Sequence, residues 1–230
     1  MIAAAAMTRL ASTARVCLAC LAPPRELLGE LLSRGVLTKL RLIEALNLPP
    51  HGRVLDVGTG RGILPILLLN ARPDLHVVGV DADHAALQWA QRNAVRSRVV
   101  PTFTPGQAER LPFASEQFDV VVSTLTLHHL PLVAKSGACR EFARVLKPQG
   151  ACYVADFAPP RGIWARLAAI VPRVTCFRHI GENFRGSIPR LLEQAGFVEV
   201  EEVFQTASSV SLHRARLPTA CHHTDAAASG

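Results

Sequence analysis

A short strand followed by three glycines constrains the fold of this chain more than any other stretch. Residues 54–57 form a largely apolar run that predicts a buried strand, and Gly58, Gly60 and Gly62 follow it. Glycine adopts positive φ and lets a ligand approach the backbone closely. A helix is expected next, from Ile63 to Ala71. A strand, a glycine turn and a helix N-terminus in this order predict a ligand site at the carboxyl edge of a parallel sheet.

Composition limits the class of protein that carries this ligand site. A length of 230 residues and a hydrophobic fraction of 49% are typical of one α/β domain with a sizeable core. No apolar run is long enough to suggest a membrane span. The net charge of +7 favours anionic partners or a basic surface. Cys17 and Cys20 lack a second nearby pair, so no metal site is expected, and reduced thiols in a cytoplasmic protein are favoured.

The next expected strand, residues 76–80, ends at Asp81. A carboxylate at the end of the second strand is suited to accept hydrogen bonds from both hydroxyls of a ribose. Its alternative role is to cap the helix expected from His84 to Ala94, but Asp83 is better placed for that cap. Asp81 is therefore predicted to bind a ribose.

Two later stretches carry weaker local signals. The third strand is expected at residues 99–103, and Pro101 assigns it to a sheet edge because proline cannot donate to a ladder. A helix is expected from Arg140 to Lys147, followed by a turn over residues 147–150. Gln149 stands where a type II turn needs positive φ, so the pattern favours a type I turn.

Several motifs together carry a family resemblance. The glycine spacing differs from the G-x-G-x-x-G of dinucleotide-binding proteins, and Asp56 precedes Gly58 by two residues. This stretch resembles motif I, D-x-G-x-G-x-G, of the class I S-adenosylmethionine-dependent methyltransferases. Residues 106–113 are similar to that family's G-D-A-x-x-L-P-F, and residues 125–130 to its L-H-H-L run. The resemblance covers residues 35–216 and is strongest to the type 11 group, which includes quinone-biosynthesis and phospholipid methyltransferases.

The resemblance implies an α/β fold, a doubly wound, Rossmann-like, seven-stranded sheet of order 3-2-1-4-5-7-6 with the last strand antiparallel. The expected organisation is an N-terminal extension, residues 1–24, and a methyltransferase domain, residues 25–216. A substrate lid, residues 157–190, is inserted in this domain, and residues 217–230 are expected to form a disordered tail.

The resemblance also implies S-adenosylmethionine as cofactor. The residues assigned to it are Asp56, Gly58, Thr59, Gly60, Gly62, Asp81, Ala82, Gln107, Ala108 and Ser123. At position 107 the family usually has an Asp that accepts a hydrogen bond from the adenine amino group. The amide oxygen of Gln107 can accept the same bond without charge assistance, so this contact is expected to be weaker.

The implied reaction is an in-line transfer of the methyl group to a small, apolar or lipid-like acceptor, with alignment of the reactants supplying much of the effect. His128 and His129 are candidate general bases, needed only if the acceptor loses a proton. Their alternative role is structural, with one packing and one capping the loop. Gln107 keeps a non-catalytic, methyltransferase-like binding or regulatory protein open as a second interpretation. A nucleotide-dependent oxidoreductase is disfavoured by the glycine spacing.

The expected lid has an unusual charge pattern. Residues 157–190 contain six arginines and one acid, Glu182, and residues 163–171 with Trp164 form a potential amphipathic helix. This pattern fits a cytoplasmic enzyme that makes peripheral contact with a membrane surface. An ordinary lid with solvated arginines remains the alternative. Nucleic acid is not expected as a partner, because aromatic residues for base stacking are scarce.

Overall fold

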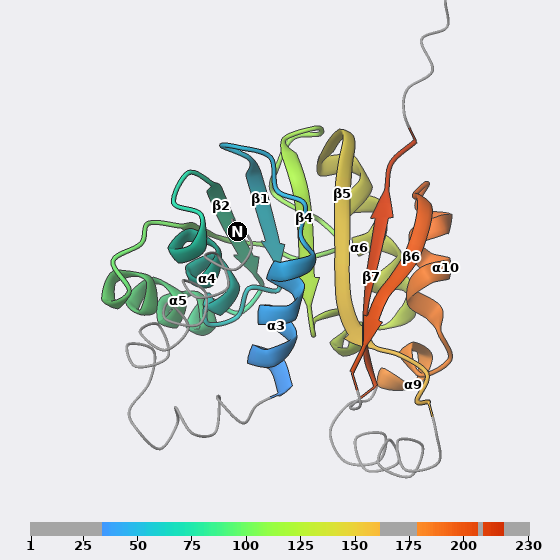
Figure 1. Ribbon diagram of the computed structural model, residues 1–230. Coiled ribbons are helices and arrows are strands. Elements are labelled where there is room, and N and C mark those ends of the chain that lie inside the picture. Colours follow the sequence, from blue (N-terminus) through green and yellow to red (C-terminus); the bar gives the residue numbers. More distant parts are fainter. Residues whose placement is uncertain (1–33, 162–178, 207–208, 219–230) are drawn as a thin grey trace, which may run out of the picture.

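The computed structural model describes residues 34–161, 179–206 and 209–218, which form a seven-stranded sheet covered by helices on both faces (Figure 1). The strand order is β3-β2-β1-β4-β5-β7-β6. Strands β1 to β5 pair in parallel, and β7 is antiparallel to both of its neighbours, β5 and β6. The predicted sheet is therefore confirmed. Its strands are β1 Arg53–Val57, β2 His76–Asp81, β3 Thr102–Pro105, β4 Phe118–Thr124, β5 Leu146–Phe157, β6 Val198–Gln205 and β7 Val210–Arg216.

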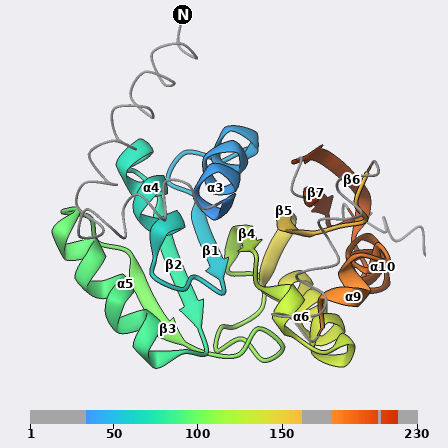
Figure 2. The same cartoon turned by 90° about the horizontal axis from the view of Figure 1, so that it is seen from below.

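The helices divide into two layers (Figure 2). Helices α3, α4 and α5 lie on one face of the sheet, and α6, α9 and α10 lie on the other. Side chains alternate along β1. Val54 packs in the core under α3 and α4, whereas Leu55 and Val57 pack in the core under α6 and α10. The helices are α3 Arg34–Ala45, α4 Ile63–Ala71, α5 His84–Arg96, the short 3₁₀ helix η1 Leu127–His129, α6 Leu132–Val145, α9 Ile180–Asn183 and α10 Ser187–Gln194.

The first βα unit forms as expected from its residues. Strand β1 is buried from Val54 to Val57, and α4 follows it after the glycine turn. Almost every residue of α4 is apolar, and Leu64 to Leu69 are all buried between the sheet and the neighbouring helices. Pro65 lies in the first turn, where its missing N–H costs no helical hydrogen bond.

The edge position predicted for the third strand is confirmed, but its predicted bounds are wrong. Strand β3 begins at Thr102, after Pro101, and pairs only with β2. The apolar pair Val99 and Val100 lies before the strand, and Val100 is 94% exposed. The two adjacent valines therefore do not mark the start of the strand, because the pairing register with β2, rather than local propensity, fixes where the ladder begins.

Two further expectations are corrected after β4. Helix α6 begins at Leu132 rather than Arg140 and ends at Val145. Its buried residues recur every three or four positions, which is the spacing of one helix face: Lys135, Ala138, Cys139, Phe142 and Val145. The predicted type I turn is also wrong. Gln149 has φ of 65°, the sign that a type II turn requires, within a β5 strand that already starts at Leu146.

The C-terminal part of the described chain consists of α9, α10 and the antiparallel β6–β7 hairpin. Gly196 follows α10 with φ of 94°, as expected for a residue just after a helix. The predicted N-terminal extension, the potential amphipathic helix at residues 163–171 and most of the predicted tail lie outside the described residues.

Candidate active site

The glycine turn lies between β1 and α4 and uses its glycines for different reasons. The N–H groups of Gly58 and Thr59 donate to the Val80 carbonyl at 2.8 and 3.0 Å, which ties the turn to the end of β2. Gly58 has φ of 75°, and a Cβ at this position would overlap the Thr126 side chain. Gly60 has φ of 54°, and a Cβ there would meet nothing within 4 Å. Close packing therefore explains Gly58, whereas Gly60 faces open space.

Asp81 connects the glycine turn to the start of α5. Its Oδ2 accepts from the Gly60 N–H at 2.7 Å, and its Oδ1 accepts from the Asp83 N–H at 2.9 Å. Asp83 itself caps α5 by accepting from the Ala85 N–H at 2.8 Å, which confirms the predicted N-cap. Because a carboxylate offers about four acceptor positions, two of those on Asp81 are left for a ligand.

A cavity of about 550 Å³ opens beside these groups, at the carboxyl edge of the parallel strands. Its wall includes six of the ten residues that the sequence assigned to the cofactor: Gly58, Gly60, Asp81, Ala82, Gln107 and Ala108. His129 also lines it, together with Leu125 and Thr126 from the loop after β4. The predicted sites from four separate parts of the chain therefore meet at one concave surface.

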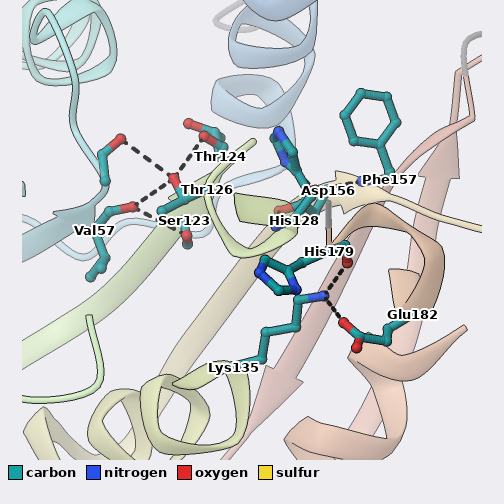
Figure 3. A network of polar contacts seen from close by, with 11 residues as sticks. Val57, Ser123, Thr124, Thr126, His128, Lys135, Asp156, Phe157, His179 and Glu182 are labelled. Carbon is teal, nitrogen blue, oxygen red and sulfur yellow. Dashed lines mark hydrogen bonds and ion pairs between the residues drawn. The ribbon is translucent and has the colours of Figure 1, made fainter. Parts of the chain in front are cut away.

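The other four assigned residues lie behind this wall. Ser123 is buried and donates its hydroxyl to the Val57 carbonyl at 3.1 Å (Figure 3), and Thr59 is buried beside Gly79. Gly62 is the N-cap of α4, where a Cβ would press on α5 and β3. Asp56 is fully buried on the α3 and α4 face of β1.

The carboxyl group of Asp56 has the most strongly shifted pKa among the acids near the site. Burial raises the pKa of its carboxyl from 3.8 to about 6, and the nearby Thr59 and Lys39 offset part of that rise. Within the part of the chain that the structure describes, neither of its oxygens has a hydrogen-bond partner of ordinary geometry. A buried carboxylate of this kind is costly unless it is protonated or meets a cation.

The two predicted histidines are placed differently. His128 is buried in η1, whereas the exposed ring of His129 lines the cavity. The ring centroids of the two residues are 4.0 Å apart. The pKa of His129 is lowered, chiefly by partial burial and also by His128, so its imidazole is neutral at pH 7. A neutral imidazole is the form that accepts a proton.

Asp156, at the end of β5, holds His128 in place (Figure 3). Its Oδ1 lies 2.9 Å from His128 Nδ1, and its Oδ2 accepts the His128 backbone N–H at 3.1 Å. An ionised carboxylate only accepts, so Nδ1 carries the hydrogen and the ring lone pair lies on Nε2. No role was expected for Asp156 from the sequence. A signal was present nevertheless, because Asp156 is a carboxylate at the end of a buried parallel strand, like Asp81.

Leu125 is a second residue that sequence reasoning missed. It follows β4 with φ of 53°, a conformation that is uncommon for a leucine, and it lines the cavity. Its N–H donates to the Ala155 carbonyl at 2.8 Å, which helps to hold the strained backbone. Strain of this kind gathers at binding sites, where surrounding contacts fix the backbone.

Helix α6, which follows the two histidines, binds the chain at His179 and Glu182. The buried ammonium of Lys135 donates to the His179 carbonyl and to Glu182 Oε2, both at 2.8 Å (Figure 3). His179 and Glu182 come directly after residues 162–178, which the structure does not describe. The predicted lid is therefore bound to α6 at His179 and Glu182.

Comparison with known proteins decides the family. A model described as a methyltransferase domain matches residues 55–154. An uncharacterized methyltransferase of Synechocystis sp. is 31% identical over 179 residues, which span 76% of this chain and 80% of that relative. The chain belongs to the class I methyltransferases of the type 11 group. It is an S-adenosylmethionine-dependent enzyme, and its relatives give no support to a non-catalytic role.

Other relatives of this methyltransferase have more specific names. A ubiquinone/menaquinone biosynthesis C-methyltransferase of Syntrophotalea carbinolica is 28% identical over 213 residues, covering 84% of this chain and 89% of the relative. Among solved structures, the YcgJ protein of Bacillus subtilis has a TM-score of 0.62 and 25% identity, covering 74% of this chain and 71% of that one. A methyltransferase structure from Aquifex aeolicus, at 18% identity and TM-score 0.63, shares the fold.

The residues present fit S-adenosylmethionine. The cofactor combines an adenine, a ribose with two hydroxyls, and a methionine part with an ammonium group. The Asp81 carboxylate has acceptor positions left, and the backbone at Gly60 is open to a ligand. The unpartnered carboxyl of Asp56, one residue before the cavity wall, suits a cation. Within the described residues, no helix is long and apolar enough to cross a membrane, and no cluster of metal-ligand side chains occurs.

Proposed function

We propose that this methyltransferase methylates a small apolar acceptor with a quinone-type or hydroquinone-type ring. Support comes from the relatives named above and from a demethylmenaquinone methyltransferase of Deinococcus radiodurans, which is 33% identical over 144 residues. The observation that carries the proposal is the pairing of His128 with Asp156 directly behind His129, at the cavity wall. A hydroxylated ring needs a base, because its phenolate is a much stronger nucleophile than the neutral phenol.

The proposed cofactor contacts follow from the cavity wall. Asp81 accepts hydrogen bonds from the ribose hydroxyls, and the amide oxygen of Gln107 accepts from the adenine amino group. The backbone at Gly58 and Gly60 lies against the methionine part, and Asp56 supplies negative charge for its ammonium. In this proposal Thr59, Gly62, Ala82, Ala108 and Ser123 shape the site, and several of them act from behind the wall.

The proposed chemistry needs one proton acceptor. His129 lies in the wall and is neutral at pH 7, so it takes the hydroxyl proton of the acceptor. S-adenosylmethionine, held by the residues of the cavity wall, would supply an electrophilic methyl group to the deprotonated acceptor, and alignment of the two reactants by the site would supply much of the effect. His128 and Asp156 hold the His129 ring from behind and provide negative charge near the imidazolium that forms.

We also propose how the rest of the chain serves this reaction. Residues 25–216 form the methyltransferase domain, and residues 157–190 close over the acceptor as a lid. The enzyme works in the cytoplasm with peripheral contact to a membrane, which suits an apolar acceptor. The six arginines of the lid segment against one acid support this contact.

The test uses the full chain with methyl-labelled S-adenosylmethionine. Acceptors are a demethylated hydroquinone with a short prenyl chain, a simple water-soluble catechol, and bulk protein. Label in the prenylated hydroquinone, lost in Asp81→Ala, is expected. Label that appears only in the catechol or in protein would contradict the proposed acceptor and leave the family assignment unchanged.

A further inference from the structure

A second hollow lies on the α6 and α10 face, apart from the cofactor cavity. It is a groove of about 530 Å³, and none of the described residues that line it lines the cofactor cavity. Helix α6 contributes Leu132, Val133 and Arg140 to its wall, and α10 contributes Arg190 and Leu191. The proposed reaction assigns this surface no role.

The groove is strongly basic. Arg140, Arg185 and Arg190 line it, and all three are exposed. Glu182 is the only acid among the described residues of its wall, and Glu182 is paired with the ammonium of Lys135 at 2.8 Å. Within the described residues, none of these arginines pairs with a carboxylate, and Arg140 donates to the Ser136 hydroxyl at 2.9 Å. Three guanidinium groups without carboxylate partners favour a ligand that carries negative charge.

Exposed apolar side chains lie beside these arginines. Val133 is 81% exposed and Leu132 is 46% exposed, both at the start of α6. Anionic groups above apolar chains are the chemistry of the boundary between lipid headgroups and acyl chains. Among the described residues of the wall, none is an aromatic residue on which a nucleic-acid base could stack. A free phosphate would leave the exposed valine and leucine unexplained.

The groove and the cofactor cavity are lined by residues that are adjacent in the sequence. Leu130 lines the cofactor cavity and Leu132 lines the groove, with only Pro131 between them. A surface that touches the start of α6 therefore lies next to the cavity rim that carries His129.

We propose that the α6–α10 groove is the surface by which the enzyme binds an anionic phospholipid bilayer. The arginines bind lipid phosphates, and Leu132 and Val133 enter the upper acyl region. The rim of the cofactor cavity then faces the membrane, from which an apolar acceptor passes into the site. This inference rests on the proposed apolar acceptor and names a membrane-binding surface that includes α6, outside the predicted lid.

The first experiment measures co-sedimentation of the full chain with vesicles of phosphatidylglycerol and phosphatidylcholine, against phosphatidylcholine alone. Arg140→Ala with Arg190→Ala is compared with Arg92→Ala with Arg96→Ala, which removes the same charge from exposed positions on α5. We expect binding to the anionic vesicles only, weakened about thirtyfold by the groove pair and less than threefold by the α5 pair. Equal losses in both pairs, or no binding by the wild type, would overturn the proposal.

A second experiment separates this surface from the proposed reaction. Val133→Asp is assayed with a long-chain acceptor in anionic vesicles and with a short-chain acceptor in solution. We expect a loss of at least tenfold with the vesicle acceptor, and wild-type rates and cofactor affinity in solution. Unchanged rates in both assays would overturn the role of the groove. Vesicle binding that depends on the groove, without methylation of either acceptor, would uphold the groove and overturn the proposed acceptor.

Discussion

The Asp156 carboxylate holds the buried His128 by two atoms at once, with Oδ1 2.9 Å from the ring Nδ1 and Oδ2 3.1 Å from the backbone nitrogen. It also accepts the Phe157 N–H at 2.7 Å. Strand β5 and η1 are thus joined at the carboxyl edge of the sheet, where the His129 ring lines the cofactor cavity. A carboxylate bound at both oxygens fixes the orientation of the imidazole, which is what a relay behind a base requires.

Asp156→Asn is expected to lower kcat about a hundredfold, because the neutral amide no longer fixes the Nδ1–H tautomer or stabilises positive charge on the histidines. Calorimetry should show unchanged affinity for S-adenosylmethionine. The control is Asp119→Asn at the start of β4, whose carboxylate pairs with Lys147 at 2.8 Å, away from the histidines. Wild-type turnover in Asp156→Asn would remove Asp156 from the mechanism.

Asp81→Ala is expected to weaken S-adenosylmethionine binding by about 1.5–3 kcal/mol, the range for hydrogen bonds to a charged group. The variant also frees the Gly60 N–H, which donates to Asp81 at 2.7 Å, so the glycine turn should loosen. Calorimetry measures the affinity, and circular dichroism checks the fold. Asp83→Ala is the control, because it should cost about 1 kcal/mol of stability as a lost N-cap and little affinity. Equal affinity in the Asp81 variant and the wild type would refute the ribose assignment.

Two glycine substitutions should separate packing from ligand binding. Gly58→Ala forces a Cβ into Thr126 at positive φ and should cost about 2–4 kcal/mol of unfolding free energy. Gly60→Val meets open space, so it should cost only the backbone strain, about 1–2 kcal/mol, while blocking the cofactor. Urea unfolding and cofactor titration measure the two effects. Normal cofactor binding by folded Gly60→Val would exclude close contact at this position.

Gln107→Asp should strengthen S-adenosylmethionine binding about fivefold, since a charged acceptor makes a stronger hydrogen bond than an amide oxygen. Gln107 lines the cavity, so an aspartate at this position also lies in the part of the wall assigned to the adenine, although its side chain is shorter. Gln107→Leu provides the comparison and should weaken binding. The same affinity in all three proteins would mean that residue 107 does not contact the adenine.

Asp56 should make stability depend on pH. Its pKa is raised to about 6 in the folded chain and is 3.8 without burial, so between these values the folded state holds more protons than the unfolded state. Raising the pH from 4 to 7 therefore lowers the unfolding free energy by about 2 kcal/mol from this group alone. Asp56→Asn removes this loss, so its stability relative to wild type should rise over that interval. Urea unfolding at both pH values measures the difference, and a constant difference would contradict it.

Sequence patterns correctly located the elements whose cause is local. An apolar strand, a turn of glycines at positive φ and an apolar helix lie together in the sequence, and so do Asp83 and the helix that it caps. Asp81 and Gln107 were predicted as site residues from strand ends and motif spacing, and both line the cavity. The sheet order came from the resemblance and is confirmed.

Tertiary structure decided what depends on residues far apart in the chain. Helix α6 starts two turns earlier than its local pattern suggested, because Lys135 is buried against His179 and Glu182. Gln149 takes positive φ in the β5 pairing, although glycine is the usual residue there. The Asp156–His128 bond joins residues 28 positions apart. Local propensity is worth only tenths of a kcal/mol per residue, whereas burial and pairing across the sheet are worth several, so long-range contacts prevail where the two disagree.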